Sequence, residues 1–109
     1  MKIAEVPFCV VDWATVEPSK HAGKTGEAFW RTFEKGNIRV RLVEYTPGYV
    51  ADHWCKKGHV LLVMEGELIT ELDDGRKFVL KAGSSYQVAE DLNPHRSYTR
   101  TGAKLFIVD

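Results

Sequence analysis

Short runs of alternating and apolar residues dominate the chain from residue 27 onward. In residues 38–45 the alternation puts Ile38, Val40 and Leu42 on one face and Arg39, Arg41, Val43 and Tyr45 on the other. Residues 59–65 are apolar throughout except at the two ends, which suits a strand covered on both faces. No stretch shows convincing helical periodicity. The pattern therefore predicts an all-β chain.

Turn signals divide this part of the chain into short strands. Asp73-Asp74-Gly75-Arg76 is the strongest of them, because Asp-Gly supplies the positive φ angles of a tight hairpin. A second turn is expected at residues 65–67. The predicted strands are residues 29–33, 38–45, 59–65, 68–72, 77–80, 86–89, 96–100 and 104–108. Strands separated by turns about every eight to twelve residues are typical of an antiparallel sandwich or barrel.

The chain of 109 residues is expected to form one domain, with an N-terminal arm over residues 1–26 and a β-barrel core over residues 27–109. Phe8 and Trp13 are expected to anchor the arm on the core. Cys9 lies in an apolar run, so we expect it to be a small buried hydrophobic residue.

Composition narrows the classes of partner and location. Fifteen basic and fifteen acidic residues cancel, which argues against nucleic acid as a partner. No apolar run approaches the ~20 residues of a membrane span, and the N-terminus lacks the pattern of a signal peptide. Two cysteines favour a reduced, cytoplasmic protein. A Cys9–Cys55 disulfide stays open as an alternative that no spacing favours.

Candidate metal ligands gather in one stretch: His53, Cys55 and His59 lie within seven residues, and His95 follows downstream. On a helix, His53 would point away from the other two. On strands, His53 and Cys55 share a face, and His59 can face them across a turn at residues 56–58. Because only the strand arrangement brings three ligands together, it favours a metal site on β-structure.

The spacing of these residues resembles the first cupin motif, with Gly48 before it and Gly66 after it. The segment from Gly75 through Gly83 to His95 resembles the second motif, so the resemblance covers roughly residues 38–108. Three positions depart from the motifs: Cys55 replaces a histidine, His59 replaces a glutamate and Thr99 replaces an asparagine. The Asp-His-Trp-Cys cluster, at residues 52–55, resembles the small cupin-fold proteins named for a DHCW motif.

This resemblance implies a cupin-like double-stranded β-helix, or jelly-roll barrel, and a metal site formed by His53, Cys55, His59 and His95. Three imidazoles and a thiolate would suit a divalent transition metal, namely Zn²⁺, Ni²⁺, Fe²⁺ or copper. Four protein ligands around a tetrahedral ion would close the site, whereas five or six coordination positions would admit water and substrate. No residue beyond the ligands carries a catalytic assignment.

The residues around the candidate metal ligands are expected to form a pocket. Leu61 and Val63 share the face of His59 and would floor it, and Tyr86 or Gln87 could edge it. If the face of Arg39 and Arg41 is internal, an arginine could bind a substrate carboxylate. The sequence favours exposed charges on an outer face instead. Asp52 is expected to be a solvated loop carboxylate, and Trp54 to pack between sheets or at a subunit contact.

Three functions are compatible with the sequence. The first is a metal-dependent enzyme acting on a small polar molecule, and the second is a non-catalytic sensor or carrier. The third is a metal-free cupin with a redox or nucleophilic Cys55. Cupins commonly pair, so a homodimer is expected.

Overall fold

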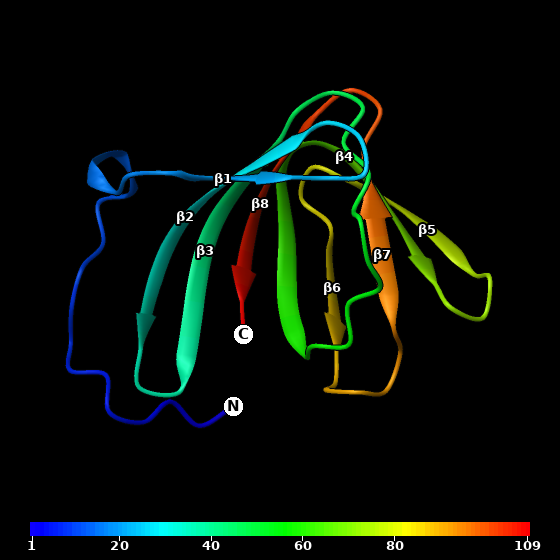
Figure 1. The fold of residues 1–109 in the computed structure, drawn as a ribbon. Coiled ribbons are helices and arrows are strands. Elements are labelled where there is room, and N and C mark those ends of the chain that lie inside the picture. The colour runs from blue at the N-terminus through cyan, green and yellow to red at the C-terminus, as the bar shows by residue number, and fades with distance from the viewer.

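The computed structural model describes residues 1–109, which form eight strands and one short 3₁₀ helix, η1 (Trp13–Thr15) (Figure 1). The strands are β1 (Ser19–Ala22), β2 (Glu27–Lys35), β3 (Ile38–Tyr45), β4 (His59–Leu72), β5 (Lys77–Lys81), β6 (Ser85–Val88), β7 (His95–Tyr98) and β8 (Ala103–Val108). The predicted all-β class is confirmed. None of the helical structure is long and apolar enough to span a membrane.

All strand pairs are antiparallel, and β4 is the strand that the two halves of the barrel share. The main path of the sheet runs β1-β2-β3-β8-β4-β5, and β6 and β7 also pair with β4. The first part of β4 pairs with β8 and β6, and its second part pairs with β5 and β7. Figure 1 shows β4 between the two groups of strands. This arrangement is the predicted jelly-roll barrel.

The turn expected at residues 65–67 is wrong, because β4 runs through them as one strand of 14 residues. The strand bends at a register shift between Val63 and Glu65 in its pairing with β8. Gly66 follows with φ of 79°, and a Cβ there would collide with the backbone oxygen of Gly102. Glycine therefore permits the bend that the sequence pattern suggested was a turn.

The core lies between the two halves and is lined by the inward faces of β3, β4, β5 and β8. Its buried apolar residues are Val43, Leu61, Val63, Leu68, Leu80, Ala103, Leu105 and Ile107. Arg41 lies on the same face of β3 as Val43 and is only 6% exposed. The expectation that Arg39 and Arg41 lie on an outer face is therefore wrong. The alternation was correctly predicted, but the face carrying the arginines is the internal one.

The N-terminal arm reaches the barrel at separate points. The backbone of Lys2 and Ala4 bonds the Asn37 side chain at the β2–β3 turn. Further on, Trp13 packs edge-on against Phe106, as expected, with ring centroids 6.4 Å apart. The arm then adds β1 to the edge of β2.

The expectations for two other residues of the arm are wrong. Phe8 is 97% exposed, and Cys9 is exposed as well. Both lie in the irregular segment between the contacts at Asn37 and at Trp13. Neither residue anchors the arm.

We predict that Gly66→Ala costs at least ~2 kcal/mol of unfolding free energy, because it adds a backbone collision to left-handed strain. Gly75→Ala is the matched control, since Gly75 also has positive φ but has nothing within 4 Å of its virtual Cβ. Urea unfolding measures both variants. Equal losses in the two would contradict a specific role for the Gly66–Gly102 contact.

Candidate metal centre

Cys55 and His95 are joined through their backbones. Cys55 N–H donates to the His95 carbonyl at 2.7 Å, and His95 N–H donates to the Cys55 carbonyl at 2.9 Å. This isolated antiparallel bridge connects the loop after β3 to the first residue of β7. The pairing fixes the thiol of one residue beside the imidazole of the other.

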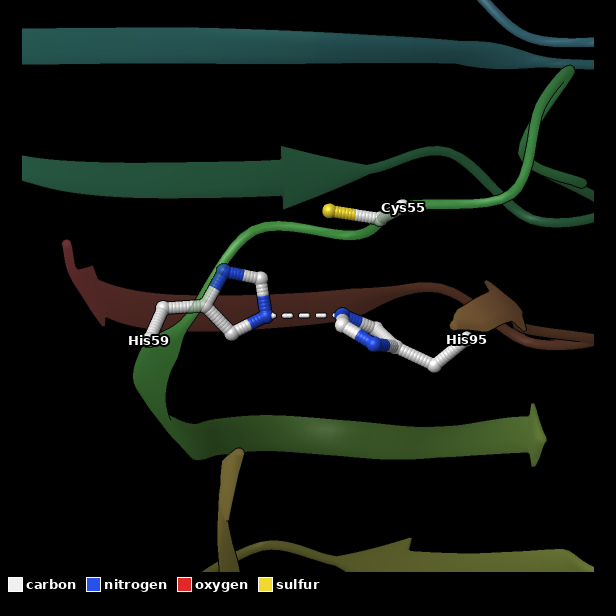
Figure 2. A group of neighbouring side chains, drawn as sticks. All are labelled: Cys55, His59 and His95. Atoms are coloured by element: carbon white, nitrogen blue, oxygen red, sulfur yellow. Dashed lines mark hydrogen bonds between the residues drawn. The ribbon is translucent and has the colours of Figure 1, made fainter. Parts of the chain in front are cut away.

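His59, the first residue of β4, completes the cluster. Its Nε2 atom lies 3.0 Å from Nε2 of His95 and 3.0 Å from the hydroxyl of Tyr86. Figure 2 shows the two imidazoles meeting through these nitrogens, with the Cys55 side chain beside them. The potential ligand atoms of Cys55, His59 and His95 all lie within 4.8 Å of one another. These residues come from three separate segments of the chain.

The hydrogen bonds of the two imidazoles test whether a metal ion fits between them. Nδ1 of His95 donates to the carbonyl of Asn93 at 2.9 Å, so its Nε2 carries a lone pair when the ring is neutral. When the His59 ring is also neutral, it must then donate from Nε2 to His95. That choice leaves its Nδ1, which is buried and has no hydrogen-bond partner, as a lone pair 3.6 Å from the Asp109 carboxylate.

A metal ion bound by both Nε2 atoms removes this conflict, as does protonation of either ring. Each ring would then carry its proton on Nδ1, directed at Asn93 in one case and at Asp109 in the other. Histidine ligands of metals ordinarily donate their second ring N–H to such oxygens. The donor set, two imidazoles and a thiolate, also suits a transition metal. The residues of this cluster therefore fit the transition metal ion that the sequence implied.

His53 lies apart from this group. Its side chain is 76% exposed, and its Nδ1 is 2.6 Å from the carboxylate of Asp52, which is itself exposed as expected. The expectation that a regular strand places His53 beside Cys55 is wrong. Residues 51–54 form no strand and only Cys55 makes a β-bridge, so alternation does not apply to them.

Trp54 was expected either between the sheets or at a subunit contact. It lies on the surface, so the first of these expectations is wrong. Its ring is partly exposed, and the guanidinium of Arg96 lies 4.4 Å from the ring centroid. The same departure from strand geometry explains this position. A cation–π contact of this kind contributes about 0.5–1 kcal/mol at an exposed site.

Cys55 and His95 influence each other's protonation. A hydrogen bond from His95 lowers the pKa of the Cys55 thiol, although burial acts in the opposite direction. Burial lowers the pKa of His95, but its bonds to Cys55 and to the Asn93 carbonyl outweigh burial and raise it. The thiolate, which is the form that binds metal, is thus favoured within the site.

Asp109 is the charged residue of the candidate site that sequence reasoning missed. Its side chain is fully buried and accepts hydrogen bonds from Arg39 at 2.8 and 3.0 Å and from Arg41 at 2.9 Å. Burial alone would raise the pKa of this carboxyl group. Contacts with His59, Arg39 and Arg41 instead hold it well below its usual range. Alternation along β8 with Leu105 and Ile107 could have placed Asp109 inside, but no motif marks it.

A cavity of about 310 Å³ opens beside the cluster. Leu61 and Tyr86 line it as expected, whereas Gln87 does not and Val63 lies in the core. Trp30, Arg39, Arg41 and Asp109 also line it, and His53 lies at its wall. The three clustered ligands therefore face a space large enough for a small molecule.

Solved structures of the same architecture are numerous, although no family model and no curated protein matches the chain. A predicted oxalate decarboxylase from Thermotoga maritima aligns with a TM-score of 0.76 and 14% identity over 92% of this chain and 96% of that one. A cupin-like protein from the same organism aligns with a TM-score of 0.70 and 20% identity over 84% and 75%.

The chain has the cupin fold. A third structure, Fe(II)-HppE with the alternative substrate (S)-1-HPP, aligns with a TM-score of 0.76 and 15% identity over 94% of this chain. The chain spans 60% of the length of that protein. Cupins of this fold thus include a metal-containing, substrate-binding protein. At these identities the likeness establishes the fold alone.

We predict that Asp109→Asn destabilises the protein by about 3–5 kcal/mol at neutral pH, because it leaves buried positive charge unpaired. The folded-state pKa of Asp109 is depressed, so the carboxylate stabilises the fold above its ordinary pKa of about 3.9 and this contribution is lost as the pH falls. The gap between wild type and variant should narrow below about pH 4.

Denaturant unfolding across the pH range measures this gap. Glu65→Gln is the control, because Glu65 pairs with Lys104 at an exposed site. This variant should change the free energy of unfolding by less than about 1 kcal/mol. A gap for Asp109→Asn that stays constant with pH would contradict the electrostatic explanation.

Proposed function

We propose that this cupin binds one divalent transition metal ion through Sγ of Cys55, Nε2 of His59 and Nε2 of His95. The observation that carries the proposal is the convergence of these three ligand atoms within 4.8 Å, on a cavity. The unpartnered Nδ1 of His59 supports it, since metal binding at Nε2 gives that nitrogen a proton and an acceptor.

Three protein ligands favour an open site over a closed one. Structural zinc sites ordinarily use four protein ligands, whereas catalytic sites use three and leave a position for water or substrate. His53 is the fourth residue of the set implied by the sequence, but its side chain is 76% exposed at the wall of the cavity and its Nδ1 contacts Asp52. We therefore propose that His53 stays outside the shell and that the cavity supplies the remaining position.

An open centre in a cavity of this size fits a small polar molecule as substrate or ligand. The ion would act as a Lewis acid or, if it is redox-active, would support oxidation chemistry. The likeness to Fe(II)-HppE, a structure that contains both iron and a substrate, supports a metal and a substrate within this fold. Thiolate and imidazole ligands keep Zn²⁺, Ni²⁺, Fe²⁺ and copper as candidates. A sensor or carrier would use the same centre without turnover.

The lowered pKa of Cys55 favours one alternative function, a metal-free cupin with a nucleophilic or redox-active thiol. In that case His95 would serve as the base that activates the thiol. The two functions differ in what the purified protein contains and in whether Cys55 is available to a thiol reagent.

We expect near-stoichiometric metal in the purified protein by elemental analysis, and its loss in Cys55→Ala, His59→Ala and His95→Ala. His53→Ala is the matched control and should retain the metal, because the His53 side chain is exposed and paired with Asp52. In a Cys9→Ser background, bound metal should protect Cys55 from iodoacetamide. Circular dichroism verifies the fold of each variant.

Two outcomes would overturn parts of this proposal. Metal-free protein with a reactive Cys55 would favour the thiol function. Loss of metal from His53→Ala would indicate that His53 is a ligand. The loop at residues 51–54 would then have to rearrange on metal binding.

We propose a homodimer formed through the outer face of the half of the barrel that contains β1, β2, β3, β8, β6 and the first part of β4. On that face of β4, Val60, Leu62 and Met64 are 40%, 38% and 48% exposed, and Leu62 lies opposite Phe106 of β8. Exposed apolar patches of this kind are typical of interaction surfaces. The free Cys9 and Cys55 thiols support a reducing, cytoplasmic location.

Leu62→Glu should convert the dimer to a monomer in light scattering, because it places a charge within the apolar row. Val79→Glu is the control, since Val79 is 58% exposed on β5, outside that face. A monomeric wild-type protein, or a Leu62→Glu variant that stays dimeric, would contradict this interface.

A further inference from the structure

The cavity beside the ligands concentrates positive charge in a chain whose total charge is zero. Its basic lining residues are Arg39, Arg41, Lys57 and Arg96, whereas Asp109 is the sole acidic one. A cysteine thiolate would cancel only one further charge. Clefts lined by one sign of charge attract ligands of the opposite sign.

Arg41 is the buried cation within this lining that has unused hydrogen-bonding capacity. A guanidinium has five N–H donors, and the side chain of Arg41 makes one hydrogen bond, from Nη2 to Asp109 at 2.9 Å. Its Nε is buried and has no partner, and the residue is 6% exposed. The N–H groups of Nη1 also have no partner and, unlike Nε, are not fully buried, so a ligand in the cavity that accepts from them gains affinity.

The neighbours of Arg41 hold its guanidinium in place. Its Cζ lies 4.4 Å from the ring centroid of Trp30, and Asp109 fixes one of its nitrogens. Arg39 differs, because it already donates from both Nε and Nη2 to Asp109. A planar, pre-oriented guanidinium with free donors is suited to a carboxylate.

Arg41 is also close to the proposed metal ligands. Oδ2 of Asp109 lies 2.9 Å from Nη2 of Arg41 and 3.6 Å from Nδ1 of His59, so a single oxygen separates the two side chains. A molecule of a few atoms can therefore contact the guanidinium at one end and the metal at the other. The aromatic rings of Trp30, Tyr45 and Tyr86 line the same cavity and would contact its apolar part.

We propose that the ligand of this cavity is a small carboxylate and that Arg41 binds its negative charge. The proposal rests on the proposed function in one respect, because it places the other end of the ligand at the metal ion. The contact with Arg41 does not itself require the ion, and this separates the two proposals experimentally.

The test compares propionate with propionamide, its neutral isostere, by calorimetric titration at constant ionic strength. Propionate should bind detectably more tightly than propionamide to wild-type protein. Arg41→Lys should weaken propionate binding by roughly tenfold, the effect of losing one hydrogen bond to a charged group, and should leave propionamide unchanged. Arg31→Lys is the matched control, because Arg31 lies on β2 and donates to the carbonyls of Trp13 and Val16, outside the cavity.

Each titration is repeated before and after removal of metal with a chelator. A propionate preference that depends on Arg41 in both forms supports the proposal, even if the protein proves to be metal-free. The carboxylate proposal is overturned if the preference for propionate disappears with the metal, or if Arg41→Lys does not alter that preference. Neither result contradicts the separate proposal of a metal site.

A readout on the wild-type protein covers the case in which Arg41→Lys fails to fold. The NMR resonance of the Arg41 Nε–H group should shift with propionate and not with propionamide. No shift with either compound would overturn the proposal.

Discussion

The bend of β4 is the constraint on which the rest of this structure depends. One strand serves both halves of the barrel because Gly66 adopts positive φ and lets the backbone of Gly102 approach where no side chain would fit. Before the bend, β4 carries His59 and pairs with β8, the strand that leads to Asp109. Beyond the bend it pairs with β7, which begins at His95. The bend thereby sets the positions of two proposed ligands and of the carboxylate beside one of them.

The position of the third proposed ligand depends on a single β-bridge. Cys55 lies in a loop that forms no strand, yet its two backbone hydrogen bonds to His95 are as short as those within a sheet. Beside this bridge the loop is free of the strand's alternation, and His53 and Trp54 consequently face solvent. The geometry therefore brings Cys55, and not His53, close to both imidazoles, although the two residues are only two positions apart. A regular strand would have presented both side chains to the same ion.

The fold and much of the site could be predicted from the sequence because they depend on local patterns. Alternation predicted the bounds of β3, and the Asp-Gly turn predicted the hairpin between β4 and β5. Glycine and ligand spacing indicated a cupin. The failures share one cause: long-range contacts decide them. Whether Arg41 faces inward depends on which side of the sheet is covered, and Asp109 matters through residues about seventy positions away. Gly66 was assigned to a turn because its close partner, Gly102, is distant in sequence.

Compared with the ligands of the cupin motif, the proposed ligand set has the same total charge but contains a softer donor atom. The cupin motif that the sequence resembles provides one anionic ligand, a glutamate, at the position that His59 occupies. Here the anionic ligand would be the thiolate at Cys55, so a divalent ion with its ligands would again keep one net positive charge. Sulfur in place of oxygen favours softer metals. The remaining positive charge adjoins Arg39 and Arg41, which share the single carboxylate of Asp109. The protein alone thus leaves the cavity cationic, and a bound anion would complete its charge balance.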